Sequence, residues 1–135
     1  MDMRGFQQYK EQSVNTMTQG ELLLLLYDEL VKRITRAELA LNKQDYPTLD
    51  ASVDRCLDIL HYLDDTLDMQ YPISGNLNRL YDYFCYELNR VKAGRNQTEL
   101  LRIKPMIIDL RDAFREADKN CSQQMEASGE AHAAT

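Results

Sequence analysis

The stretch Gly20–Leu30 reads GELLLLLYDEL and contains five consecutive leucines. A helix that buries one face needs an apolar residue at about every third or fourth position, so this stretch holds more leucines than one face can use. The segment TQGE (Thr18–Glu21) is typical of a capping box, in which Thr18 accepts from the third helical amide and Glu21 reaches back to the cap. The sequence therefore predicts a long helix that begins at Thr18 and carries surplus apolar surface.

Two prolines bound a second helix. The first helix is expected to run to about Lys43, where NKQDYP breaks it, and Pro47 suits the first turn of the next helix. The second helix is expected to run to about Gln70 and to stop before Pro72, because the residue before a proline disfavours helical geometry.

Two further helices follow. Ser74 can cap a third helix over Gly75–Ala93, and Gly94 is suited to end it. The segment NQTE (Asn96–Glu99) resembles another helix start, and a fourth helix is expected to continue to about Lys119.

Four long helices with short connections predict an all-α fold, an antiparallel up-down four-helix bundle over residues 18–120. Pro105 lies inside the fourth helix, removes one backbone hydrogen bond and is expected to kink it. Residues 1–17 form a short, weakly helical N-terminal segment. Residues 121–135, which are small and polar, predict a disordered tail.

The composition excludes several classes of partner. The formal net charge of −6 disfavours nucleic acid or an anionic membrane, since phosphate binding needs clustered Lys and Arg. No apolar run approaches the roughly 20 residues of a membrane-spanning helix, and the N-terminus lacks a signal-peptide core. Cys56, Cys85 and Cys121 are odd in number and form no CxxC pair, which favours reduced thiols and a cytoplasmic location.

No pattern of residues predicts an enzyme, a metal site or a cofactor. His61 has Asp58 three residues before it and Asp65 four after it, a conceivable metal corner, but a solvated helix face is the commoner meaning of this pattern. An exposed histidine on a bundle also suggests a phosphotransfer domain. The aspartates around His61 would repel a phosphoryl group, which disfavours that alternative.

Sorting each helix at 100° per residue separates a core stripe from leftover apolar residues. Aligned leftovers form a continuous exposed surface, which calls for an explanation. One explanation is that the N-terminal segment or imperfect bundle geometry covers them. The other is a groove for an amphipathic partner helix. The leftovers that define this predicted surface are Leu24, Val31, Ile59, Tyr62, Met69, Tyr86, Leu101 and Ile108.

Four motifs in order resemble the FliS family of flagellar secretion chaperones, over roughly residues 6–118. YKEQSV (Tyr9–Val14) is similar to the family's opening Tyr-x-x-x-x-Val, and Gly20–Asp45 resembles its first long helix and acidic loop. LYDYFCYELNRVKAGRN (Leu80–Asn96) resembles its third helix and Asn-rich turn. LRDAFREAD (Leu110–Asp118) resembles its closing Asp-Ala-Trp.

The chain departs from this pattern at three places. MTQG (Met17–Gly20) replaces the family's usual Ala-Ser-Pro, although Thr18 preserves a cap. Phe114 replaces the tryptophan and keeps an aromatic residue there. Pro105 stands where an ordinary helix former is expected. This departure affects the expected straightness of the fourth helix but not the expected fold.

The resemblance implies a cytosolic chaperone without catalysis that binds the disordered C-terminal segment of flagellin, prevents premature polymerisation and delivers flagellin to the type III export apparatus. The eight leftover residues would then bind the client. The family's N-terminal segment can cover part of the client surface and helps to present the loaded complex to the export gate, a role that would fall to Phe6 and Tyr9. The alternative is a helical adaptor whose apolar stripes mediate homodimerisation without flagellin binding.

Overall fold

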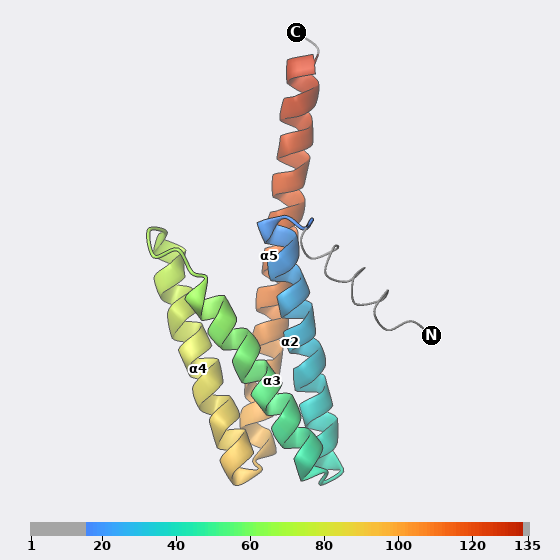
Figure 1. Cartoon of the computed structure of the whole chain (residues 1–135), viewed down its shortest axis with the longest axis vertical. Coiled ribbons are helices and arrows are strands. Elements are labelled where there is room, and N and C mark those ends of the chain that lie inside the picture. The colour runs from blue at the N-terminus through green and yellow to red at the C-terminus, as the bar shows by residue number, and fades with distance from the viewer. Residues whose placement is uncertain (1–15, 134–135) are drawn as a thin grey trace, which may run out of the picture.

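A computed structural model describes residues 16–133 as four helices: α2 (Gln19–Asn42), α3 (Tyr46–Asp65), α4 (Pro72–Gly94) and α5 (Gln97–Ala133). Side chains are described up to residue 124. Successive helices run in opposite directions, and the described range contains no strand (Figure 1). The predicted all-α, up-down four-helix bundle is confirmed.

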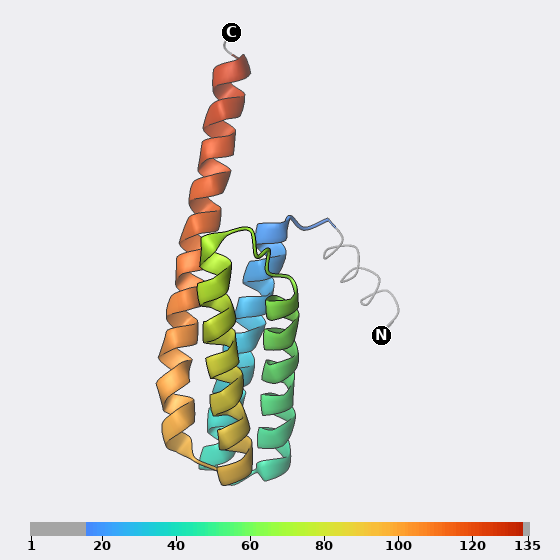
Figure 2. The same cartoon turned by 90° about the vertical axis from the view of Figure 1, so that its left-hand side faces the viewer.

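The helices occupy the corners of a square. α2 packs on α3 and α5, and α4 packs on the same two helices, so each helix has two neighbours and one diagonal partner (Figure 2). Each helix must therefore bury a face wide enough to contact two others, which is wider than a single a/d stripe.

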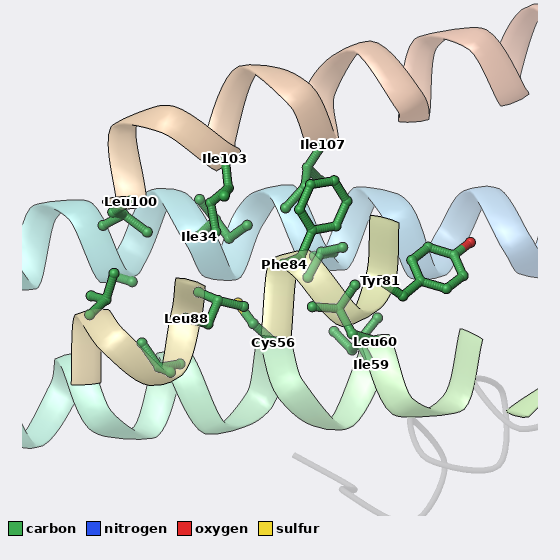
Figure 3. Packing of buried hydrophobic residues seen from close by; sticks show 14 of the residues in the cluster. Ile34, Cys56, Ile59, Leu60, Tyr81, Phe84, Leu88, Leu100, Ile103 and Ile107 are labelled. Carbon is green, nitrogen blue, oxygen red and sulfur yellow. The ribbon is translucent and has the colours of Figure 1, made fainter. Parts of the chain in front are cut away.

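One apolar core fills the space between the helices. Ile34, Leu60, Phe84 and Ile107 come from four different helices and point towards one another (Figure 3). Burying a side chain of this size contributes about 1.5–3 kcal/mol. The buried apolar residues are Tyr27, Leu30, Ile34, Ala37, Ala40, Leu41, Leu49, Val53, Cys56, Ile59, Leu60, Leu63, Leu77, Tyr81, Phe84, Leu88, Val91, Leu100, Ile103 and Ile107.

The start of α2 confirms the capping box. The amide of Glu21 donates to Thr18 Oγ1 at 3.1 Å, and the amide of Thr18 donates to a Glu21 carboxylate oxygen at 3.4 Å. The helix ends at Asn42, next to the expected Lys43.

The connection between α3 and α4 differs from the prediction. α3 ends at Asp65, before the expected Gln70, because the chain turns so that Leu67 packs against the core. α4 begins at Pro72, whose fixed φ suits the first helical position, and not at Gly75. Ser74 therefore lies inside the helix and donates its hydroxyl to the Asp68 carbonyl, so its predicted role as a cap is wrong.

α5 continues past the expected end at Lys119 and projects beyond the other helices (Figures 1 and 2). The expected disordered tail is not found up to Ala133, because residues 121–133 contain no proline and elongating an existing helix avoids the cost of nucleation. The helix also passes through Pro105 without being split.

Candidate functional site

The structure places the eight predicted surface residues in three environments. Tyr62, Met69, Tyr86 and Leu101 are exposed, with 46–65% of their surface accessible. Leu24, Val31 and Ile108 are half-buried. Ile59 is buried, and Phe6 and Tyr9 lie outside the described residues.

The expectation that Ile59 lies off the core is wrong, since only 3% of its surface is exposed. α3 packs against both α2 and α4, so its buried face extends further round the helix than one stripe, and Ile59 falls inside it. The reverse error affects α2: sorting by angle leaves Leu22 and Leu26 in the core stripe, apart from the eight leftovers, but both are only half-buried.

Two ion pairs, one half-buried and one exposed, cross the seam between α2 and α5. Lys104 Nζ lies 2.6 Å from a Glu38 carboxylate oxygen, and an Arg115 guanidinium nitrogen lies 3.0 Å from Asp28 Oδ1. These two ion pairs connect the antiparallel helices across the seam.

Four of the predicted residues share the faces that carry these ion pairs. Val31 lies between Asp28 and Glu38 on α2, and Ile108 lies between Lys104 and Arg115 on α5, at spacings of one or two helical turns. Leu24 and Leu101 continue the same two faces. The four residues Leu24, Val31, Leu101 and Ile108 form what we name the α2–α5 strip, an apolar surface partly screened by charged side chains.

A more open depression runs between α2 and α3. We name it the α2–α3 groove; its volume is about 240 Å³, and its lining residues are Leu22, Leu26, Arg55, Asp58, Ile59 and Tyr62. The groove unites the buried Ile59 and the exposed Tyr62 with two leucines of the GELLLLLYDEL stretch. Arg55 and Asp58 add one charge of each sign to its α3 side.

The groove leads to a second depression at the end of the bundle. A small hollow of about 30 Å³ contacts both, since it shares Leu22, Leu26 and Tyr62 with the groove and Leu23 and Leu63 with the larger depression. This larger depression, the end hollow, has a volume of about 270 Å³ and is lined by Gln19, Gly20, Leu23, Leu63, Thr66, Leu67, Asp68, Tyr71, Ile73, Ser74, Leu77, Tyr81 and Phe114.

The end hollow exists because the α3–α4 connection leans away from the start of α2. In Figure 1 this connection lies to the left of α2, at the end of the bundle from which α5 projects. Tyr71 and Ile73 flank Pro72 there and are 62% and 58% exposed. Neither residue belongs to the predicted surface, although two large apolar residues beside a proline in a short connection are a usable signal in the sequence.

Aromatic side chains lie beneath the end hollow. The hydroxyl groups of Tyr27 and Tyr81 are hydrogen-bonded to each other, and the ring of Tyr27 stacks on Phe114 with centroids 5.2 Å apart. Burial is the main cause that raises the pKa of Tyr27 well above its ordinary value, followed by the proximity of Tyr81. This pair joins the diagonal helices α2 and α4, and both tyrosines stay protonated at neutral pH.

Two of the predicted residues lie outside these surfaces. Met69 belongs to the α3–α4 connection and is 65% exposed but lines neither depression. Tyr86 is on α4, where the Arg90 guanidinium lies 5.7 Å from the centre of its ring. That guanidinium also contacts the buried carboxylates of Glu87 and Glu99, at 3.2 Å in each case.

Nothing in the described part of the chain assembles a metal site: no group of three or more His, Cys, Asp or Glu side chains is placed to hold an ion there. His61 is exposed on α3. Among residues 16–133, no helix has both the length and the apolar character needed to cross a membrane.

Comparison with known proteins connects these surfaces to a family. Residues 2–121 match the model of the family described as flagellar protein FliS. The chain is 28% identical to the flagellar secretion chaperone FliS of Bacillus subtilis (strain 168) over 121 residues, which cover 90% of this chain and 91% of the relative. It is 20% identical to the flagellar secretion chaperone FliSB of Pseudomonas aeruginosa (strain PAO1) over 118 residues, which cover 83% of this chain and 94% of the relative. A four-helix bundle with an apolar groove, matched over nearly its whole length by this family model, places the chain in the FliS family of flagellar proteins.

Proposed function

We propose that this chain is a cytosolic export chaperone that binds the disordered C-terminal segment of flagellin, prevents its premature polymerisation and delivers it to the flagellar type III export apparatus. The observation that carries this proposal is the open, largely apolar α2–α3 groove that continues into the end hollow. Membership of the family, and two relatives named as flagellar secretion chaperones, support it.

The mechanism is coupled folding and binding, without catalysis. The part of α3 from Arg55 to its C-cap Thr66 flanks the groove and the small hollow, and it spans about 17 Å, enough for about three turns of a client helix. Leu22, Leu26 and Tyr62 would contact the apolar face of that helix. Each large client side chain that is buried contributes about 1.5–3 kcal/mol, offset by the cost of ordering a disordered segment.

The remaining predicted residues have secondary places in this proposal. A second client segment would lie along the α2–α5 strip, made by Leu24, Val31, Leu101 and Ile108. Met69 and Tyr86 are exposed and would be further apolar contacts with the client. Phe6 and Tyr9, which lie outside the described residues, remain the proposed contacts with the export gate.

Calorimetry with a peptide that spans the C-terminal segment of the flagellin encoded in the same genome tests the proposal. We expect 1:1 binding with a clearly negative heat-capacity change, which reports burial of apolar surface. Tyr62→Glu places a charge in the groove and is expected to weaken binding at least tenfold. Leu39→Glu is the matched control, because Leu39 is 56% exposed and lines neither depression.

The competing hypothesis gives a different result. If the apolar surfaces mediate homodimerisation, sedimentation will show a concentration-dependent dimer, and the peptide will not bind. That combination of results would exclude the chaperone function in favour of a helical adaptor.

A further inference from the structure

Cationic side chains gather at the end of the α2–α3 groove that lies away from the end hollow. Arg55 of α3 lines the groove but lines neither the end hollow nor the small hollow between them. On α2, Arg33 Nε lies 2.8 Å from Glu29 Oε1, and Lys32 Nζ lies 3.9 Å from Glu29 Oε2. Arg36 is exposed one turn after Lys32. The four residues Lys32, Arg33, Arg36 and Arg55 form what we name the basic rim.

A single carboxylate, that of Glu29, is shared by most of these cations. The pKa of Glu29 is lowered: burial alone would raise it, but the hydrogen bond from Arg33 and the surrounding positive charges, including that of Arg55, lower it below its ordinary value. Arg36 and Arg55 form no ion pair among the described residues. The capacity of Glu29 is therefore already used, and Arg36 and Arg55 are left without a carboxylate of their own.

The other carboxylates nearby do not cancel this positive charge. Asp58 lines the groove one turn after Arg55 and is exposed. Asp28 and Asp54 are instead paired with cations of α5 and α4. The four cations of the basic rim therefore face only the carboxylates of Glu29 and Asp58, on a chain whose formal net charge is −6.

The other end of the groove has the opposite charge. Among the described residues that line the end hollow there is no Lys, Arg or His, and the charged side chain is that of Asp68. The Asp118 carboxylate lies against Gly20, which also lines the hollow, and adds negative charge there. The remaining polar side chains of the lining are neutral: Gln19, Thr66, Tyr71, Ser74 and Tyr81. The continuous apolar surface is thus positive at the groove end and negative at the hollow end.

We infer that the client segment in the α2–α3 groove carries carboxylate side chains at the end that lies over the basic rim and none at the end that enters the end hollow. A guanidinium without a carboxylate partner, such as that of Arg55, attracts a carboxylate and can donate two parallel hydrogen bonds to it. A segment with the reverse charge pattern would bring like charges together at both ends, so the charges decide how the client lies in the groove. This inference rests on the proposed function.

The variants Arg55→Glu and Arg79→Glu are matched charge reversals. Both arginines are exposed, and both substitutions change the net charge by the same amount, so long-range repulsion of the peptide changes equally. Arg79 is on α4 and lines neither depression. We expect Arg55→Glu to bind the flagellin C-terminal peptide roughly 5- to 30-fold more weakly than Arg79→Glu does, since reversal removes an attraction and adds a repulsion. Circular dichroism establishes that both variants are folded, and equal affinities would overturn the inference.

Charge exchange in the peptide identifies the group that Arg55 contacts. Each Asp and Glu of the peptide is replaced by Lys in turn, and each peptide is titrated into both variants. At one position or more, the Lys peptide should bind the Arg79→Glu variant more weakly than the original peptide does, and the Arg55→Glu variant more tightly, because an attractive pair is restored. If no position gives this exchange, Arg55 contacts no client carboxylate and the inference is wrong.

The parent chain separates the failure of this inference from the failure of the proposed function. Absence of peptide binding to the parent chain contradicts the proposed function itself. Binding to the parent chain without a difference between the two variants refutes only the charge pattern inferred for the client. A concentration-dependent dimer of the parent chain that Arg55→Glu abolishes in sedimentation would assign the basic rim to a contact between two copies, which also overturns the inference.

Discussion

The carboxylate of Asp118 lies so close to the α-carbon of Gly20 that a Cβ added at Gly20 would overlap it. Gly20 is in the first turn of α2, and Asp118 is on α5. The missing side chain therefore allows the two helices to approach each other beside the end hollow.

This contact predicts coupling between the two positions. Gly20→Ala raises helix propensity, a gain of up to about 1 kcal/mol, but forces the Asp118 side chain to rotate away. In an Asp118→Ala background the same substitution meets no obstacle and should give the larger gain. Urea denaturation of the four chains measures both values, and an equal gain in both backgrounds would show that the contact has no energetic consequence.

Substitution of Ile59 should damage the fold before it affects binding. Because Ile59 is buried, Ile59→Ala is expected to cost about 2–4 kcal/mol, and Ile59→Asp should abolish cooperative thermal unfolding. Tyr62 lies three residues further along α3 and is exposed. Tyr62→Glu should therefore leave the melting temperature nearly unchanged. Thermal denaturation followed by circular dichroism compares the three variants, and an unchanged melting temperature for Ile59→Asp would contradict the burial described above.

The guanidinium of Arg90 stabilises two buried carboxylates, those of Glu87 and Glu99. Arg90→Met should therefore lower the urea midpoint markedly, since it leaves Glu99 buried without a counter-charge. Glu99→Gln in the same chain should restore part of the loss.

The matched control for Arg90 is an exposed ion pair. Lys92→Met breaks the contact with Asp54 on the surface and should change the midpoint little. A similar loss for Arg90→Met and Lys92→Met would mean that burial of the two glutamates is not what makes Arg90 important.

The three cysteines should differ in reactivity. Burial raises the pKa of Cys56 to about 12, and burial together with Asp82 and Asp64 raises the pKa of Cys85 to about 11. Cys121 is exposed on α5. At pH 7.5, Ellman's reagent should modify Cys121 first, then Cys85 and last Cys56, as mapped by mass spectrometry of digested samples. Modification of Cys56 at the rate of Cys121 would contradict the packing of the core.

The ion pair between Asp50 and Arg95 makes stability depend on pH in the acid range. A hydrogen bond from Arg95 is the main cause that lowers the pKa of Asp50 below its ordinary value. Its folded-state pKa lies below its unfolded-state value, so the contribution is complete above about pH 4 and is lost as the pH falls through the folded-state pKa. Asp50→Asn should flatten the fall in stability below pH 4.

Arg95→Gln provides the cross-check for the same pair. It should flatten the acid dependence as much as Asp50→Asn does, and the double variant should add nothing further. Urea midpoints at pH 3, 4, 5 and 7 would measure this, and additive effects would show that the two residues act through different partners.

Local signals in the sequence were sufficient for the architecture. The capping box at Thr18, the breaks around Pro47 and Pro72, and the four amphipathic patterns predicted a four-helix bundle, and the ordered motifs predicted the family. These features act within a helix or one turn, so they can be identified without knowing which helices are neighbours.

The functional surface depended on information that no single helix contains. Whether Ile59 is core, or whether Leu22 lines a groove, depends on which two helices α3 and α2 contact and how wide a face those contacts cover. The hydrogen bond between Tyr81 and Tyr27 also depends on packing, because it crosses the diagonal of the bundle. Periodicity, helix caps and prolines in the sequence determined the helices and their number. The lateral packing of those helices decided which of the surplus leucines in GELLLLLYDEL face a groove, because burial depends on a residue's neighbours and not on the residue itself.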